Sequence, residues 1–282
     1  PEYAQRFIAE ADRLGVEYQT DTTVLQITPG RQVYAASKTG YRAYQAQAVI
    51  LAMGCRERTC GALAIPGTRP AGIYTAGVAQ AFINLKNRMV GRNIVILGSG
   101  DIGLIMARRL TLEGACVQAV YEIQPYPNGL PRNIRQCLDD FGIPLHLSHT
   151  VTQIRGKSRL EGVTVARVDE QLRPIAGTER DVACDTLILS IGLIPENELS
   201  LMAGVVLDPR TRGAAVDQFL QTTVPGIFAA GNVLQVHDLA DDVSREAERL
   251  AESIVHYLAY PESEAAAIPI KTDENIVYTV PQ

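Results

Sequence analysis

Three glycines, Gly98, Gly100 and Gly103, have the spacing Gly-x-Gly-x-x-Gly directly after the apolar run of residues 93–97. Glycines at this spacing allow a tight turn from a strand into a helix, and they let the backbone approach a phosphate group closely. The N–H groups and the dipole at the start of the helix then bind the negative charge. The acidic residue Glu122 lies 19 residues beyond Gly103, at the end of the next apolar run. This pattern predicts a dinucleotide-binding βαβ unit. The remaining loop residues that we expect to contact the dinucleotide are Ser99, Asp101 and Ile102.

Glu122 discriminates between the two nicotinamide dinucleotides. Its carboxylate can accept hydrogen bonds from the adenosine ribose hydroxyls, and it would repel a 2′-phosphate. The residues that follow, Ile123 and Gln124, supply no arginine to neutralise such a phosphate. We therefore expect NAD rather than NADP. The alternative is a glycine-rich turn in a Rossmann-like domain that has lost its ligand.

Three other apolar runs also end at glycine. Each brings a strand to a position where exposed backbone can face a planar ligand, although each, taken alone, is more often a buried strand end or a turn. The strand-end residues concerned are Met53 and Gly54, Gly192, and Gly231 and Asn232.

The apolar pattern predicts the elements that position these glycines. Residues 3–14 have helical spacing, and short strands separated by turns lead to the apolar strand 48–52. From residue 67 to about 190, helices and strands alternate, which is typical of βαβ units with a parallel sheet covered on both faces. The other expected elements are helices at 78–88, 101–113, 132–141 and 241–257 and strands at 24–28, 32–37, 42–45, 93–97, 116–121, 144–147, 150–154, 162–168, 186–190, 205–207 and 226–229.

In this order, the four glycine-terminated elements resemble the two-dinucleotide flavoproteins, the FAD/NAD(P)-dependent pyridine nucleotide-disulfide oxidoreductases, over the chain to about Tyr260. The resemblance implies an α/β fold in which a Rossmann-like NAD domain is inserted into an incomplete FAD-binding domain. The implied divisions are the FAD domain at 1–65 and 191–260, the NAD domain at 66–190 and a C-terminal tail at 261–282.

The FAD part of this resemblance departs from the family at three points. The strand ends at Met53-Gly54 and Gly231-Asn232 would contact FAD, but the 282 residues contain no second glycine fingerprint for the FAD diphosphate. Asn232 stands where the family has Asp, so a hydrogen-bond acceptor is kept and the charge is lost. Thioredoxin reductases carry Cys-x-x-Cys before the NAD-binding strand, whereas residues 73–79 contain no cysteine. Dithiol reduction of that kind is therefore disfavoured.

The resemblance implies an activity, hydride transfer between NAD(H) and flavin N5, with an unknown electron acceptor. Residues 54–59, 65–72 and 236–239 match most closely a bacterial subgroup often found beside glycerol-3-phosphate dehydrogenase and glycerol kinase. Because the chain starts at Pro1 and lacks the FAD fingerprint, we expect a fragment of a longer parent, or a subunit of a homodimer or a larger complex, that is inactive alone. The alternatives are a non-enzymatic NAD-binding module and a purely structural interaction protein.

Composition and the absence of other motifs exclude several classes. The formal net charge is −5 and the pI is near 5.5, so the chain lacks the surplus of lysine and arginine that nucleic-acid binders need. Its longest apolar runs are far shorter than the roughly 18 residues that span a bilayer. No Gly-x-Ser-x-Gly, His-Glu-x-x-His or Walker sequence is present, which argues against hydrolases and kinases.

Cysteines and histidines complete the set of reactive side chains. Five cysteines, mostly in apolar runs, are typical of free thiols in a reducing compartment, so we expect a cytoplasmic protein. Cys55 and Cys60 have the spacing of a redox disulfide but follow a strand that ends at Gly54, which favours two ordinary thiols. The four histidines show no metal-ligand spacing, and no metal is assigned. His237, just before the last helix, is the one weak candidate for a catalytic group. The resemblance implies that the start of this helix points at the flavin, where an imidazole can move protons during flavin reduction. The alternative, which is the commoner case, is an ordinary loop histidine.

Overall fold

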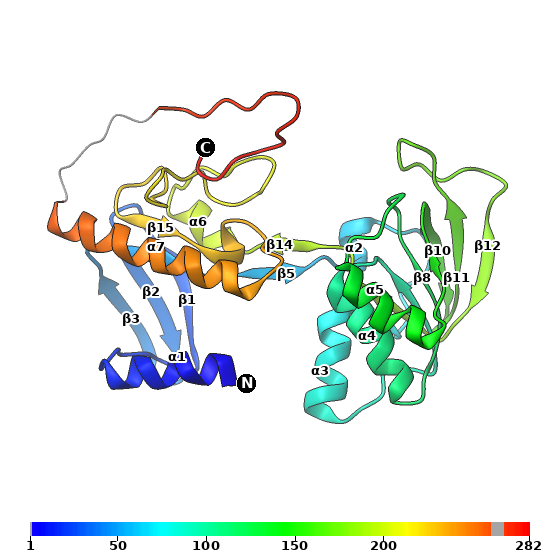
Figure 1. Ribbon diagram of the computed structural model, residues 1–282. Helices are drawn as coiled ribbons and strands as arrows, with labels where there is room; N and C mark the ends of the chain where they lie inside the picture. Colours follow the sequence, from blue (N-terminus) through cyan, green and yellow to red (C-terminus); the bar gives the residue numbers. More distant parts are fainter. Residues whose placement is uncertain (1, 261–267) are drawn as a thin grey trace. The chain divides into compact units, whose positions relative to one another are not determined.

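The computed structural model describes residues 2–260 and 268–282 (Figure 1). The chain forms two compact units. Arg56–Ile194 is called here the inserted unit, and Pro1–Cys55 with Pro195–Gln282 is called the outer unit. The segment from 66 to 190, for which an NAD domain is expected, falls within the inserted unit.

Two short strands carry the chain between the units. β5 (Cys55–Glu57) leads into the inserted unit and β14 (Leu193–Pro195) leads out of it, and the two strands pair with each other.

The inserted unit is built on a five-stranded sheet in the order β6-β13-β7-β8-β9, in which every neighbouring pair is parallel. The central strands consist of apolar and β-branched residues because both of their faces are covered. From β7 the chain passes through α4 to β8 on one side, whereas β13 pairs with β7 on the other side. The carboxyl ends of β7 and β13 therefore form a topological switch point, where ligands bind in such sheets. The strands are β6 (Ile73–Thr75), β7 (Asn93–Leu97), β8 (Cys116–Tyr121), β9 (Leu145–His146) and β13 (Thr186–Leu189).

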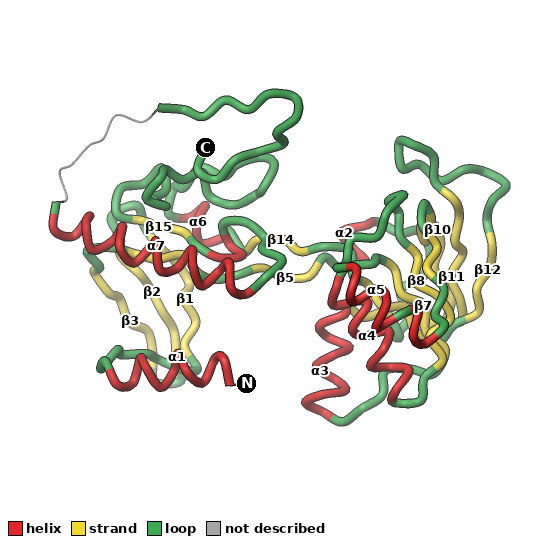
Figure 2. Tube along the Cα trace, in the orientation of Figure 1, coloured by secondary structure: helices red, strands yellow, loops and turns green. Residues whose placement is uncertain are grey.

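Helices cover one face of this sheet and a second sheet covers the other (Figure 2). α4 packs against α3 and α5 on the helical face, in a core that includes Ile94, Leu104 and Ile188. The antiparallel sheet β10-β11-β12 packs its apolar side chains against Val95 and Leu187 on the other face. These elements are α2 (Cys60–Leu63), α3 (Ala76–Lys86), α4 (Asp101–Leu112), α5 (Pro131–Cys137), η1 (Asp139–Phe141), β10 (His149–Gly156), β11 (Leu160–Arg167) and β12 (Arg180–Ala183).

The outer unit contains a three-stranded antiparallel sheet, β1-β2-β3, and the parallel pair β4-β15. Its core includes Leu51, Phe228 and Leu250, and Val280 near the C-terminus packs against it. The elements are α1 (Glu2–Arg13), β1 (Thr22–Ile27), β2 (Gln32–Ser37), β3 (Gly40–Gln45), β4 (Val49–Leu51), α6 (Glu198–Met202), β15 (Ile227–Ala229), η2 (Gly231–Val233) and α7 (Ala240–Ala259).

Two expectations about local structure are wrong. The helix expected at 132–141 ends at Cys137 and is followed only by a 3₁₀ turn, η1. Gly142, in the left-handed region, ends this turn by donating its N–H to the Asp139 carbonyl. The strand expected at 205–207 is an irregular segment with a single bridge from Leu207 to Ala214. A short apolar run is compatible with a strand or with an irregular buried segment. Here Val205 is buried in the core without the backbone hydrogen bonds that pair one strand with another.

Part of the expected C-terminal tail lies outside the described residues, namely 261–267. Among the described residues no helix is long and apolar enough to span a membrane.

Candidate functional site

The glycine loop lies at the carboxyl end of β7 and is packed against Ser190, the residue that follows β13. Gly98 has φ +96°, and a Cβ atom there would collide with the Ser190 carbonyl oxygen. A Cβ at Gly103 would lie 2.5 Å from the Ser190 Cβ, and one at Gly100 would lie 3.1 Å from Ser190 Oγ. The Ser190 hydroxyl also accepts a hydrogen bond from the Gly103 N–H at 3.1 Å. The close approach of Ser190 thus excludes a side chain at Gly98 and Gly103 and leaves little room for one at Gly100.

The acidic residue at the start of α4 is bonded to a neighbouring segment of the chain. Asp101 Oδ1 accepts hydrogen bonds from Leu130 N and Asn133 Nδ2, both at 2.8 Å, and so holds the start of α5. The N–H groups of Asp101 and Ile102 are in the first turn of a helix and have no intrahelical carbonyl to bond. Ile102 itself is 39% exposed. Free N–H groups at a helix start are the kind of donors that bind phosphate groups.

Glu122 lies at the end of β8, only 3% exposed, and its carboxylate is held against the glycine loop. Glu122 Oε2 accepts hydrogen bonds from Ser99 N at 2.9 Å and Ser99 Oγ at 2.7 Å, and Oε1 accepts one from Gln124 N at 2.9 Å. Ser99 is fully buried, so its side chain orients Glu122. Oε2 thus accepts two hydrogen bonds, whereas Oε1 accepts one and retains a lone pair for a further donor.

A cluster of rings flanks the strand end that carries Glu122. Tyr121 stacks on His146 with ring centroids 5.1 Å apart, and His149 lies 5.7 Å from His146. Burial, followed by the neighbouring His149 and Arg180, lowers the pKa of His146 below its ordinary value. The neutral imidazole is therefore favoured, and it supplies no positive charge for a 2′-phosphate.

Gly192 follows β13 in the inserted unit with φ +95°, and a Cβ built there would meet no atom within 4 Å. Its carbonyl oxygen accepts a hydrogen bond from Arg58 N at 3.0 Å. Gly192 itself is exposed to solvent.

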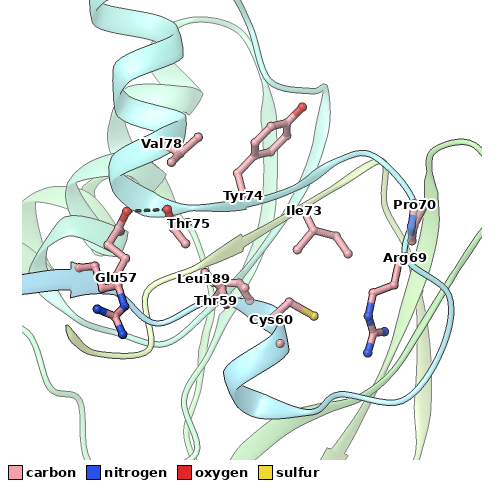
Figure 3. Close-up of a pocket in the computed structure, with 12 residues that line it drawn as sticks. Glu57, Thr59, Cys60, Arg69, Pro70, Ile73, Tyr74, Thr75, Val78 and Leu189 are labelled. Atoms are coloured by element: carbon pink, nitrogen blue, oxygen red, sulfur yellow. Dashed lines mark hydrogen bonds between the residues drawn. The ribbon is translucent and has the colours of Figure 1, made fainter. Parts of the chain in front are cut away.

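A cavity of about 540 Å³ lies at the carboxyl ends of β6 and β13, beside the start of α3 (Figure 3). Glu57 fixes this helix start, because its carboxylate accepts hydrogen bonds from Thr75 Oγ1 at 2.5 Å and Gly77 N at 2.8 Å. The volume is in the range of small-molecule sites. The lining residues are Arg56, Glu57, Thr59, Cys60, Gly61, Arg69, Pro70, Ile73, Tyr74, Thr75, Val78 and Leu189.

A second group of expected site residues lies together in the outer unit. β4 and β15 pair in parallel with Leu51 opposite Ala229, so their carboxyl ends are adjacent. Gly54, after β4, has φ +75° and open space where a Cβ would point, and Met53 packs on the core. The Gly231-Asn232 turn follows β15.

His237 and Glu246 adjoin this second group. Asn232 Oδ1 accepts a hydrogen bond from His237 N at 3.0 Å. Glu246, from α7, accepts one from Gly231 N at 2.5 Å and lies 3.4 Å from His237 Nε2. His237 Nδ1 is buried and has no hydrogen-bond partner in residues 2–260 and 268–282.

The structure thus brings the expected residues together as two groups. Gly98 to Gly103, Glu122 and Gly192 lie in the inserted unit, and Met53, Gly54, Gly231, Asn232 and His237 lie in the outer unit. Sequence reasoning missed Ser190 and Glu246. All five cysteines are free thiols, and across residues 2–260 and 268–282 no group of three metal-binding side chains is found.

Comparison with known proteins identifies the family. The sequence profile of the pyridine nucleotide-disulphide oxidoreductases matches residues 2–250. The ferredoxin–NADP reductase of Leuconostoc mesenteroides is 24% identical over 238 residues, which are 80% of this chain and 65% of the relative. The dihydrolipoyl dehydrogenase of Pseudomonas aeruginosa is 30% identical over 167 residues, 58% of this chain and 34% of the relative. The chain therefore spans less than two thirds of the length of these curated relatives.

A solved structure, the thioredoxin reductase of T. acidophilum, matches with a TM-score of 0.71 and 22% identity, covering 92% of this chain and 80% of that one. This confirms the expected α/β fold of two-dinucleotide flavoproteins. Proteins of the family use FAD and a nicotinamide dinucleotide. The match over residues 2–250 shows that this chain belongs to the pyridine nucleotide-disulphide oxidoreductase family.

Proposed function

We propose that this chain is part of an oxidoreductase that transfers a hydride between NAD(H), bound by the inserted unit, and FAD, bound by the outer unit. The observation that carries the proposal is the glycine loop packed on Ser190, with the start of α4 and the Glu122 carboxylate beside it. Such a loop has the features of a diphosphate cradle.

The inserted unit holds the nicotinamide dinucleotide. The backbone from Gly98 to Gly103 and the first N–H groups of α4 bind the diphosphate, and Glu122 accepts the adenosine ribose hydroxyls. Glu122 favours NAD, because its charge repels a 2′-phosphate, and burial lowers the pKa of the neighbouring His146 below its ordinary value. The ferredoxin–NADP reductase among the relatives uses the other dinucleotide by name, so this residue is the specificity determinant to test.

The cavity beside α3 receives the nicotinamide end. Leu189 lines it, and the next residue in the chain is Ser190, on which the glycine loop packs. The diphosphate site and the cavity therefore lie at the same edge of one sheet, on adjacent strands. Val78→Trp would fill the cavity from α3. We expect it to weaken NADH binding while leaving ADP-ribose binding unchanged, and equal losses for both ligands would contradict this assignment.

The outer unit fits the flavin end of FAD. α7 is a long helix whose first N–H groups are free of intrahelical bonds. His237 Nδ1 is a buried polar atom with no partner in the part of the chain that the structure describes. Met53, Gly54, Gly231 and Asn232 complete the site. The chain supplies no second glycine fingerprint for the FAD diphosphate.

Bound together, the cofactors supply the hydride donor and acceptor. The residues of this chain bind the diphosphate, orient the ribose and exclude water from the apolar side of the cavity. The five free cysteines support a cytoplasmic, reducing location.

A second candidate is a non-enzymatic NAD-binding module, and the single glycine fingerprint favours it. Purified chain is mixed with FAD, freed of unbound cofactor and examined by visible absorption, and NADH binding is measured separately. The hydride-transfer proposal predicts a retained flavin band and NADH binding that Gly100→Val abolishes. NADH binding without retained flavin would favour the module, and unchanged NADH affinity of Gly100→Val would refute the phosphate loop.

A further inference from the structure

Glu246 is a buried carboxylate in the second turn of α7 that joins two parts of the outer unit. Its side chain is 11% exposed and that of His237 is 10% exposed. One oxygen accepts the hydrogen bond from Gly231 N at 2.5 Å, and the other lies 3.4 Å from His237 Nε2. A carboxylate so enclosed requires a compensating positive charge or several donors.

The backbone nitrogen and the Nε2 atom of His237 have polar neighbours, whereas its Nδ1 atom has none among the described residues. Its N–H bonds Asn232 Oδ1 at 3.0 Å, and its Nε2 lies 3.5 Å from Gln235 Nε2 as well as near Glu246. Nδ1 is buried and meets no partner among the described residues. Because buried polar atoms are nearly always hydrogen-bonded, this nitrogen is left for a ligand atom.

Three acidic residues lie close to the pair in sequence. Asp238 and Asp241 are exposed, at the end of the loop and the start of α7. Asp242 pairs with Arg245 at 3.3 Å. Among the described residues, Glu246 is the acidic side chain that lies 3.4 Å from His237 Nε2.

We propose that His237, held by Glu246, takes up the proton that balances the negative charge placed on the flavin by reduction, while its Nδ1 hydrogen-bonds the cofactor. This rests on the proposed function, since it requires FAD in the outer unit. Glu246 is a positioning residue, because it acts through His237 and the Gly231 backbone.

The step balances in atoms and charge. A hydride from NADH carries two electrons and one proton to flavin N5, which leaves NAD⁺ and a singly negative reduced flavin. His237 binds one further proton from water and becomes an imidazolium between Glu246 and the flavin. No other oxidant or reductant is needed, and the proton returns to water when the flavin is reoxidised.

The test counts protons rather than turnover. The full chain loaded with FAD is titrated anaerobically with dithionite and indicator dyes at several pH values, and the pH dependence of the midpoint potential gives the protons bound per flavin. We expect His237→Gln to bind about one proton fewer than the wild type. Glu246→Gln should also reduce the number of protons bound per flavin. An equal proton count in the wild type and His237→Gln would overturn the inference.

Matched controls lie on the same helix. His256→Gln and Glu252→Gln alter exposed side chains of α7 and should leave the proton count unchanged. A second measurement needs no variant: the imidazole ¹⁵N resonances of His237 are recorded with oxidised and with reduced flavin. Protonation on reduction supports the inference, and unchanged resonances overturn it.

Failure of the proposed function is recognised separately. A wild-type chain that retains no flavin refutes FAD binding and this inference with it. A chain whose flavin is reduced by NADH, but whose His237 stays neutral, refutes the inference alone.

Discussion

Ser99 and Glu122 are joined by two hydrogen bonds, from the Ser99 N–H at 2.9 Å and from its hydroxyl at 2.7 Å, both to Glu122 Oε2. The Ser99 hydroxyl also accepts a hydrogen bond from Asn128 N at 2.9 Å. Ser99, between the first two glycines of the fingerprint, therefore connects the proposed diphosphate site to Glu122 in the proposed ribose site. A change in either residue should affect both dinucleotide binding and the stability of the loop.

Ser99→Ala removes the hydroxyl that bonds a buried carboxylate. We expect the free energy of unfolding to fall by about 1.5–3 kcal/mol, the range for hydrogen bonds to charged groups, and NADH to bind more weakly. Urea denaturation and NADH titration measure both. Ser253→Ala on α7 is the control, since its hydroxyl bonds only the Arg249 carbonyl within an exposed helix. Equal denaturation midpoints for the two variants would contradict the role of Ser99.

Glu122→Gln keeps the size of the side chain and removes its charge. Because the charge is what repels a 2′-phosphate, the ratio of the dissociation constants for NADPH and NADH should shrink by about tenfold, which corresponds to ~1.4 kcal/mol. Glu122→Arg should shift the preference further toward NADPH. Fluorescence titration with each dinucleotide measures the ratio, with Glu161→Gln, at an exposed position of the otherwise buried strand β11, as the control. An unchanged ratio would remove Glu122 as the specificity determinant.

Gly103→Ala places a Cβ 2.5 Å from the Ser190 Cβ. We expect a loss of stability of about 1–3 kcal/mol from overpacking, and Ser190→Gly in the same chain should recover part of it, because the two residues are in contact. Gly61→Ala in α2 is the matched control, as its nearest neighbour, Thr59 Oγ1, is 3.8 Å away. Strictly additive effects of the two substitutions would show that the contact does not constrain the glycine.

The loop could be predicted from sequence because its determinants are local. Gly98 to Gly103 and Glu122 follow from spacing along one βαβ unit. Ser190 could not be found that way, since 87 positions separate it from Gly103 and only the pairing of β13 with β7 brings them together. The same holds for Glu246, which reaches Gly231 across a 15-residue separation that includes an irregular loop.

Local patterns also failed where tertiary packing decides the conformation. The apolar residues 205–207 were expected to form a strand, but Val205 fills the core from an irregular segment. The burial of Glu122 was equally outside sequence reasoning, which treats an acidic side chain as exposed. Its carboxylate accepts hydrogen bonds from Ser99 of the glycine loop and from Gln124 N, which only the folded geometry reveals.

Cys184 makes stability depend on pH in the alkaline range. Burial, followed by the Asp185 carboxylate, raises the pKa of this thiol from 9.0 to about 11. The folded state then holds the proton more tightly than the unfolded state, so the stabilisation is complete below pH 9 and is lost as the pH rises toward about 11. We expect the free energy of unfolding to fall less steeply over this window in Cys184→Ala than in the wild type. Cys116→Ala, at an exposed position, should keep the steep fall, and identical slopes in all three proteins would contradict the assignment.

The central claim is hydride transfer between the two dinucleotides, and anaerobic addition of NADH to the FAD-loaded chain tests it most directly. The account predicts that the visible flavin band bleaches with one equivalent of NADH per flavin, and that Gly100→Val, loaded with the same FAD, stays coloured. A wild-type flavin band that persists in excess NADH would contradict the claim.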